Sequence, residues 1–137
     1  MAKVTLELEY DYDFTLIGVS CHSRDYKFCW LINNFLDLNF IRQDSIQLKT
    51  KNIASEFANY TYTDDNSRLA YTLLTNRGTQ GFLLPEQKQA DYLIKIEGGF
   101  SHTEEVEMIK KIKRIDAVLT AFIIDVNSLK SKQNLIL

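Results

Sequence analysis

The chain has 137 residues, of which 45% are hydrophobic and 25% are charged, and its formal net charge at pH 7 is −2. This composition is typical of a soluble globular protein, and the length predicts a single domain, residues 1–137, with a buried core. The acidic balance disfavours a dedicated nucleic-acid-binding protein, and no apolar run approaches the roughly 20 residues of a membrane-spanning helix. Met1 to Val4 lack the apolar stretch of a signal peptide, and Cys21 and Cys29 are too few for a disulfide framework. We therefore expect a cytoplasmic protein with reduced thiols.

An alternating segment opens the chain. From Val4 to Phe14 apolar residues alternate with polar ones, which is typical of a half-buried strand, with a bend near Asp11–Asp13. Leu16–Ser20 should continue extended, with Gly18 as a bulge or a close-packing site.

A helix is predicted over Arg24–Leu38. Ser23 suits the N-cap position and Asp25 suits the first turn. Apolar residues recur behind them at helical spacing and should pack on a sheet: Phe28, Leu31, Ile32 and Phe35.

The middle of the chain favours strands. Ile41–Lys51 alternates weakly and is interpreted as a short strand or a loop. Glu56–Thr63 and Arg68–Asn76 are predicted to form an antiparallel hairpin, because Asp64–Ser67 consists of turn-forming residues.

The single proline, Pro85, separates two apolar runs. The residue before a proline is pushed to extended geometry, and proline has no N–H for a sheet, so Pro85 should mark the end or the edge of a strand. The following run predicts a strand with one wetter face, because Tyr92, Ile94 and Ile96 alternate with Leu93 and Lys95.

A second helix should begin after Gly98-Gly99. Ser101 and Glu104 have the spacing of a capping box. Its apolar face is predicted to contain Val106, Ile109 and Ile112, extended by Met108 and Ile115. Cations gather in its last turns, where the helix dipole favours them: Lys110, Lys111, Lys113 and Arg114.

Ala117–Val126 is apolar at nearly every position. Such a strand is either central in a covered sheet or part of a subunit contact. We assign Val118, Phe122 and Ile124 to one face, which is the candidate interface, and Leu119, Ala121 and Ile123 to the other. Residues 127–137 are predicted to be a tail whose apolar end is suited to docking.

The order of these elements predicts an α+β fold. We expect a two-layer sandwich, with a mainly antiparallel sheet, two helices on one face and a C-terminal strand–helix–strand unit. The unit over Asp91–Val126 resembles half of a ferredoxin-like or ACT-type regulatory domain, and parallel strands in it would require a right-handed crossover.

Leu84-Pro85-Glu86, three free positions and Ala90-Asp91-Tyr92 resemble the signature of the IPExxxVDY family of small bacterial proteins. Leu84 stands in place of its isoleucine and Ala90 in place of its valine. The resemblance extends to Tyr12–Gly18 and Thr120–Ile123. It implies a bacterial cytoplasmic protein and transfers no catalytic residue, because the family has no assigned activity.

Three sets of residues are candidate sites. Glu86 and Asp91 could form an acid–base pair, but local hydrogen bonds, with Glu86 capping the Gln87–Gln89 turn, explain them better. Cys21-His22 before a helix could hold a thiolate, but a buried structural cysteine is the simpler interpretation. The third set is a possible ligand loop for an anion or a metal, although a turn and a helix cap explain the same residues: Gly98, Gly99, Ser101, His102 and Glu104.

No catalytic group, metal cluster or cofactor loop is evident from the residue pattern. We expect a non-enzymatic interaction or regulatory module, forming a homodimer. One alternative is a small-ligand sensor of ACT-like type, for an amino acid or an anionic metabolite, at Gly98–Glu104. Another is an RNA-binding accessory protein using Lys110–Arg114, although this basic run is better explained by the helix dipole.

Overall fold

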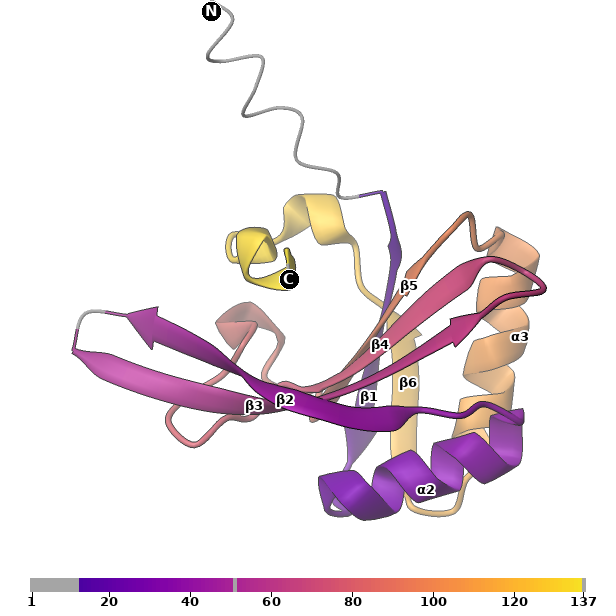
Figure 1. The fold of residues 1–137 in the computed structure, drawn as a ribbon, viewed down its shortest axis with the longest axis horizontal. Coiled ribbons are helices and arrows are strands. Elements are labelled where there is room, and N and C mark those ends of the chain that lie inside the picture. Colours follow the sequence, from indigo (N-terminus) through magenta and orange to yellow (C-terminus); the bar gives the residue numbers. More distant parts are fainter. Residues whose placement is uncertain (1–12, 51, 137) are drawn as a thin grey trace, which may run out of the picture.

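The computed structural model describes residues 13–50 and 52–136, and this part of the chain has an α+β fold, as predicted (Figure 1). The strand predicted over Val4–Phe14 lies almost wholly outside the described residues. The longer elements are β1 (Thr15–Cys21), α2 (Asp25–Leu36), β2 (Ile41–Thr50), β3 (Ile53–Asp64), β4 (Leu69–Thr75), β5 (Tyr92–Glu97), α3 (His102–Lys113) and β6 (Val118–Ile123). Three short 3-10 helices complete it: η1 (Pro85–Gln87), η2 (Val126–Ser128) and η3 (Lys132–Leu135).

All of these strands belong to one sheet with the order β2-β3-β4-β5-β1-β6, and every neighbouring pair is antiparallel. The predicted β3–β4 hairpin is confirmed, and the ambiguous Ile41–Lys51 segment is the long strand β2. Because β1 is antiparallel to both of its neighbours, β5 and β6 run parallel with β1 between them. The predicted C-terminal unit is therefore a split β-α-β unit.

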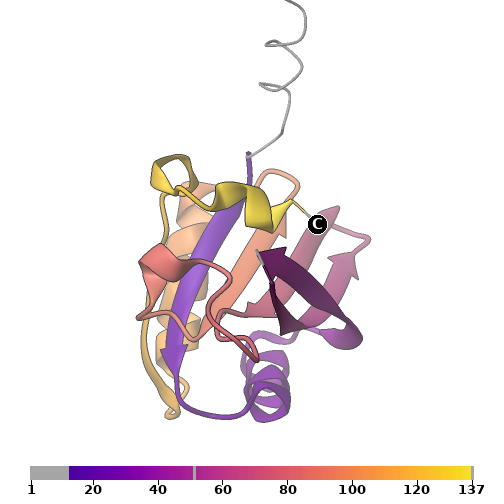
Figure 2. The same cartoon turned by 90° about the vertical axis from the view of Figure 1, so that its left-hand side faces the viewer.

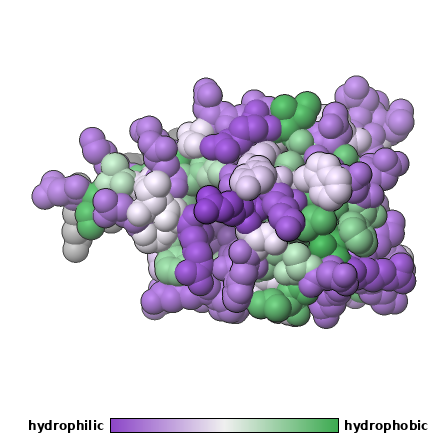
Figure 3. Space-filling view, turned by 90° about the horizontal axis from the view of Figure 1, so that it is seen from below, coloured by the Kyte–Doolittle hydropathy of each residue, from purple (hydrophilic) through white to green (hydrophobic). Residues whose placement is uncertain are grey.

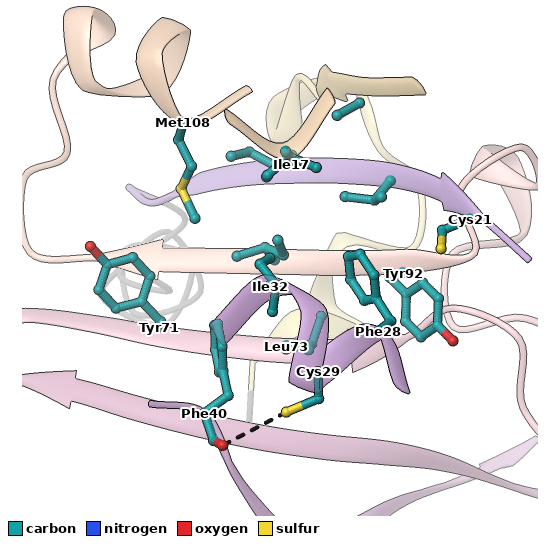
Figure 4. Close-up of a cluster of buried hydrophobic side chains, with 14 of the residues drawn as sticks. Ile17, Cys21, Phe28, Cys29, Ile32, Phe40, Tyr71, Leu73, Tyr92 and Met108 are labelled. Carbon is teal, nitrogen blue, oxygen red and sulfur yellow. Dashed lines mark hydrogen bonds between the residues drawn. The ribbon is translucent and has the colours of Figure 1, made fainter. Parts of the chain in front are cut away.

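Both helices lie on the same face of the twisted sheet, as predicted (Figure 1). The core under them contains Phe28, whose ring is stacked on that of Tyr92 with centroids 4.5 Å apart (Figure 4). The buried stripe of α2 is Phe28, Cys29 and Ile32. Phe35 was predicted to join them but is 52% exposed, because the helix is rotated so that Cys29 faces the sheet instead.

The starts of the two helices differ. The N-cap of α2 is Arg24 rather than the predicted Ser23, and Arg24 makes no side-chain capping bond. The capping box of α3 is confirmed: the Ser101 hydroxyl accepts from the Glu104 amide, and the Glu104 carboxylate accepts from the Ser101 amide. Val106, predicted for the buried face of α3, is partly exposed, and Met108 and Ile112 carry that face.

The opposite face of the sheet is also covered, by the connection between β4 and β5 and by the C-terminal segment (Figures 1 and 2). Leu83, Leu84 and Leu135 are fully buried in this second core. Residues 127–136 are therefore docked on the sheet, as predicted for the apolar end of this segment. The wetter face predicted for β5 is wrong, because the docked segment covers it and leaves Lys95 only 6% exposed.

Candidate functional site

A buried asparagine organises the connection that contains Pro85. Asn76 is fully buried, and its side-chain nitrogen donates to the carbonyls of Gln87 (2.8 Å) and Ala90 (2.9 Å). Its side-chain oxygen accepts from the amide of Leu84 at 2.7 Å. Asn76 was not predicted as a site residue, because an asparagine at the end of a strand is an ordinary turn residue and gives no signal of burial.

The apolar residues of the predicted family motif are held by packing and backbone geometry. Leu84 and Ala90 are fully buried in the second core. Leu84 is extended, with φ −117° and ψ 92°, as predicted for the residue before a proline. Pro85 does not end a strand, as was predicted, but begins η1, where the N–H that it lacks has no partner to lose.

Glu86 binds the C-terminal segment. Its Oε2 accepts from the amides of Lys130 (2.6 Å) and Ser131 (3.0 Å), and its Oε1 accepts from the Ser131 hydroxyl. Burial by itself would raise the pKa of Glu86, but these hydrogen bonds, first among them the Ser131 hydroxyl, outweigh it and lower the pKa to about 2. The partners of Glu86 are thus 44 and 45 residues away, and not the Gln87–Gln89 turn that was predicted.

Asp91 is 8% exposed and binds two other segments. Its Oδ2 accepts from the amide of Cys21 at 2.9 Å, and its Oδ1 accepts from Nε of Arg77 at 2.9 Å. The partner of Oδ2 is a backbone amide, but the bond is not local as predicted, because Cys21 lies 70 residues away in the sequence. Arg77 was not predicted. Glu86 and Asp91 do not act as a carboxylate pair, because each is bound to a different part of the chain.

Tyr92 completes the motif. Its hydroxyl donates a hydrogen bond to the carbonyl of Ser23, just before α2, and burial raises the pKa of this hydroxyl. Glu86, Asp91 and Tyr92 each join segments that are far apart in sequence. The motif therefore stabilises the junction of the C-terminal segment, β1 and α2.

Asp91 and Tyr92 also line a polar depression of about 410 Å³. Its charges are paired: Asp91 binds Arg77, while Asp25 accepts from the Tyr60 hydroxyl at 2.7 Å and from Arg42 at 3.4 Å. Cys21 is buried at its border, which favours the structural interpretation of that thiol, whereas His22 is exposed. Within the described residues, the two carboxylates of the depression, Asp25 and Asp91, accept hydrogen bonds from arginine side chains, a backbone amide and a tyrosine hydroxyl. Neither is hydrogen-bonded to a cysteine thiol or a histidine there, as a catalytic pair would require.

The predicted ligand loop is not assembled as one site. Ser101 and Glu104 are used in the capping box, and the side chain of His102 is 87% exposed, with Nδ1 3.4 Å from Glu105. Gly98 and Gly99 have φ values of 115° and 89°, so they form a turn that other residues rarely adopt. Of these five residues, Glu104 lines a depression between α2 and α3.

The basic run at the end of α3 is exposed to solvent. Lys110, Lys111 and Lys113 lie in its last turn, on the same helix as the acidic Glu104 and Glu107. This arrangement agrees with the predicted dipole role, and a contact of these residues with RNA stays a prediction.

The candidate interface on the last strand differs from its prediction in two ways. β6 lies at an edge of the sheet, and its register against β1 shifts because Leu119 is an extra residue between Val118 and Thr120. Val118 therefore faces the helices, while Phe122 and Ile124 face the second core. Val118 and Ile124 are buried within the chain itself. The exposed apolar residues of this strand are instead Leu119 (65%) and Ile123 (44%).

The described residues contain neither a metal-binding cluster nor a membrane-spanning helix. Residues 13–50 and 52–136 contain no group of three or more histidine, cysteine, aspartate or glutamate side chains that could hold a metal ion. None of the helices in the same residues is long and apolar enough to cross a membrane. Comparisons of this chain with models of protein families, with curated proteins and with solved structures give no match.

Proposed function

We propose that this chain is a non-enzymatic interaction module that forms a homodimer through the outer edge of β6. The observation that carries the proposal is the difference between the two edges of the sheet. An edge strand exposes unpaired backbone groups, and proteins that must stay monomeric protect such strands with charges, prolines or bulges that face outwards.

The edge at β2 is protected in this way. It contains Arg42, Asp44 and Lys49, and its register against β3 shifts between Gln43 and Ile46. β6, with the sequence VLTAFI, contains no charge and no proline, and its one register shift lies at its start, between Val118 and Thr120, so that Thr120–Ile123 is regular. No described strand pairs with its outer side. This edge is therefore the one suited to pairing with another strand.

The hydrogen bonding of β6 suggests how two copies would pair. The Ile124 amide donates to the carbonyl of Leu16, so alternation along an antiparallel strand directs the backbone groups of Ala121 and Ile123 outwards. Two copies related by a two-fold axis would then pair Ala121 of one with Ile123 of the other, with Phe122 opposite its own copy. The sheet would continue from one subunit into the next.

Other apolar residues are exposed on α2, but they are a weaker candidate. Tyr26, Trp30 and Phe35 are all more than half exposed. The underside of the molecule, where α2 lies, shows pale and green residues dispersed among purple hydrophilic ones (Figure 3). Singly exposed apolar residues are normal on protein surfaces and do not by themselves indicate a partner.

The remaining parts of the proposal follow from the site. A non-enzymatic role is supported by the way Glu86, Asp91 and Tyr92 are used to join segments of the chain. A cytoplasmic location is supported by the free thiols of Cys21 and Cys29. The Leu84–Tyr92 motif supports membership of the IPExxxVDY family. The role of that family signature would then be to hold the fold together.

Light scattering coupled to size-exclusion chromatography tests the dimer. The unmodified chain should elute as a dimer. Ile123→Lys should elute as a folded monomer, because it places two ammonium groups near the two-fold axis. Ile41→Lys is the matched control, since Ile41 is 56% exposed on the opposite edge strand. A monomeric wild-type chain at high concentration, or a dimer that survives Ile123→Lys, would show that the proposal is wrong.

The proposed register has its own test. Residues directly opposite in a non-hydrogen-bonded antiparallel pair have Cα atoms about 4.5 Å apart, which is within the range of a disulfide. Phe122→Cys should therefore form a covalent dimer on mild oxidation. Thr103→Cys, exposed on α3, should not. A cross-link at Thr103 and none at Phe122 would place the contact elsewhere.

A further inference from the structure

A depression between the end of α2 and α3 has an apolar floor. Its volume is about 210 Å³, and its apolar walls are Leu36, Leu38, Phe100 and Met108. Leu36, Leu38 and Phe100 are only partly buried, so one side of each is accessible from the depression. An apolar cavity of about 150 Å³ is sufficient for benzene. The depression therefore has room for one ring or one branched aliphatic chain.

Tyr71 gives this depression a polar group without a partner. It is 8% exposed, and its ring is fixed by stacking on Tyr62, with centroids 5.6 Å apart, and by edge contacts with Phe40 and Phe100. The hydroxyl is turned out of the buried cluster on the side of Met108 (Figure 4). It makes no hydrogen bond to any residue between 13 and 50 or between 52 and 136. The hydroxyl oxygen is not among the fully buried polar atoms of the described residues, so it is accessible from the depression to a bound group.

The rim of the depression is acidic. Glu104, Glu107 and Lys111 line it from one side of α3. Glu104 uses Oε1 in the capping box, which leaves Oε2, and no ion pair joins Glu107 to Lys111 within the described chain. Burial raises the pKa of the Tyr71 hydroxyl, as do the negative charges of Asp64 and Glu104. Two carboxylates against one ammonium favour a cationic ligand.

We propose that this depression binds a small organic cation, in which a protonated amine is attached to an apolar body of about one ring. The amine donates hydrogen bonds to the carboxylates of Glu104 and Glu107 and to the Tyr71 oxygen. The apolar body packs on Met108 and Leu38. This site goes beyond the dimer proposed above and does not depend on it, because none of its lining residues belongs to β6. It is also distinct from the predicted sensor site for an amino acid or an anionic metabolite at Gly98–Glu104, with which it shares Glu104.

Benzylamine is a suitable probe, and its binding to the 137-residue chain can be followed by protein-observed NMR. A fragment of this size should bind with a Kd on the order of 1 mM, with shifts of the α3 amides between Glu104 and Lys111. Benzyl alcohol keeps the ring and loses the charge, so it should bind at least about fivefold more weakly, and benzoate more weakly still. No saturable binding of benzylamine, or equal binding of benzyl alcohol, would overturn the proposal.

Two variants locate the binding. Glu107→Gln removes an exposed charge without affecting the core, and it should weaken benzylamine binding by about threefold to tenfold. Tyr71→Phe keeps the ring and removes the hydroxyl, and it should also weaken binding while the circular dichroism spectrum stays unchanged. Glu56→Gln is the control, because Glu56 is an exposed glutamate on β3 outside this depression. Unchanged affinity in Glu107→Gln would exclude the site.

Discussion

Lys95, in the middle of the sheet, donates a hydrogen bond from its ammonium to the carbonyl of Leu135, 40 residues later, at 2.8 Å. The ammonium also lies 4.8 Å from the ring centroid of Phe14, and 3.8 Å from Glu97. A buried lysine is tolerated only when such partners are present. The C-terminal segment is therefore held by a specific polar contact as well as by the burial of Leu135.

Replacing this lysine should loosen the C-terminal segment. Lys95→Met keeps the length of the side chain and leaves the Leu135 carbonyl without its donor, which should cost about 1–3 kcal/mol. Hydrogen exchange at residues 130–136 should accelerate, while exchange in α2 and α3 changes little. Lys88→Met, at an exposed lysine, should have no effect. Equal exchange in both variants would contradict a role for the Lys95–Leu135 contact.

Replacing Asp91 should destabilise the fold more than replacing Arg77, the arginine that it binds. Asp91→Ala removes the acceptor of the buried Cys21 amide and should cost about 2–4 kcal/mol. Arg77→Ala should cost about 1 kcal/mol or less, because the Arg77 side chain is 63% exposed and such ion pairs are screened by water. Urea unfolding of both variants gives the comparison. Similar costs would mean that the ion pair, and not the amide, is the main contribution.

The parts of the fold that were predicted correctly are those that depend on residues close together in the sequence. The β3–β4 hairpin follows from two alternating runs around Asp64–Ser67, and α3 follows from the Ser101 and Glu104 spacing. The position of each strand in the sheet was not predictable in the same way. β6 is apolar on both faces yet lies at an edge, because strand order is set by contacts between distant segments.

The candidate site shows the same division. The residue type of Asp91 indicated a backbone amide as its partner. The roles of Arg77 and Asn76 could not be predicted, because they depend on how the β4–β5 connection folds back. Lys95 was placed on a wetter face because lysine is almost never buried without a partner, and the partner is supplied by η3. The extra residue at Leu119 left no signal in the pattern and reversed the face of Val118.

The contact between Glu86 and Ser131 should make stability depend on pH. The pKa of Glu86 falls from its ordinary value of 4.5 to about 2 in the folded chain, so its contribution is fully present above pH 4.5 and is lost as the pH falls towards 2. Because Glu86 is largely exposed, we expect Glu86→Gln to cost only about 1 kcal/mol at pH 7. Denaturant unfolding of both proteins between pH 7 and pH 2 should show this difference shrinking as the pH falls. A difference that stays constant with pH would argue against the charged contact.

The two glycines before α3 should differ in their tolerance of alanine. Both have positive φ, so Gly99→Ala should cost about 1–2 kcal/mol through backbone strain alone, since a Cβ there meets nothing within 4 Å. A Cβ at Gly98 would lie 2.6 Å from the carbonyl oxygen of Arg68, which belongs to the backbone and cannot turn aside. Gly98→Ala should therefore cost at least about 1 kcal/mol more than Gly99→Ala in urea unfolding. If the two variants are equally stable, the turn has shifted to accept the methyl group, and Phe100 should then show altered NMR shifts in Gly98→Ala alone.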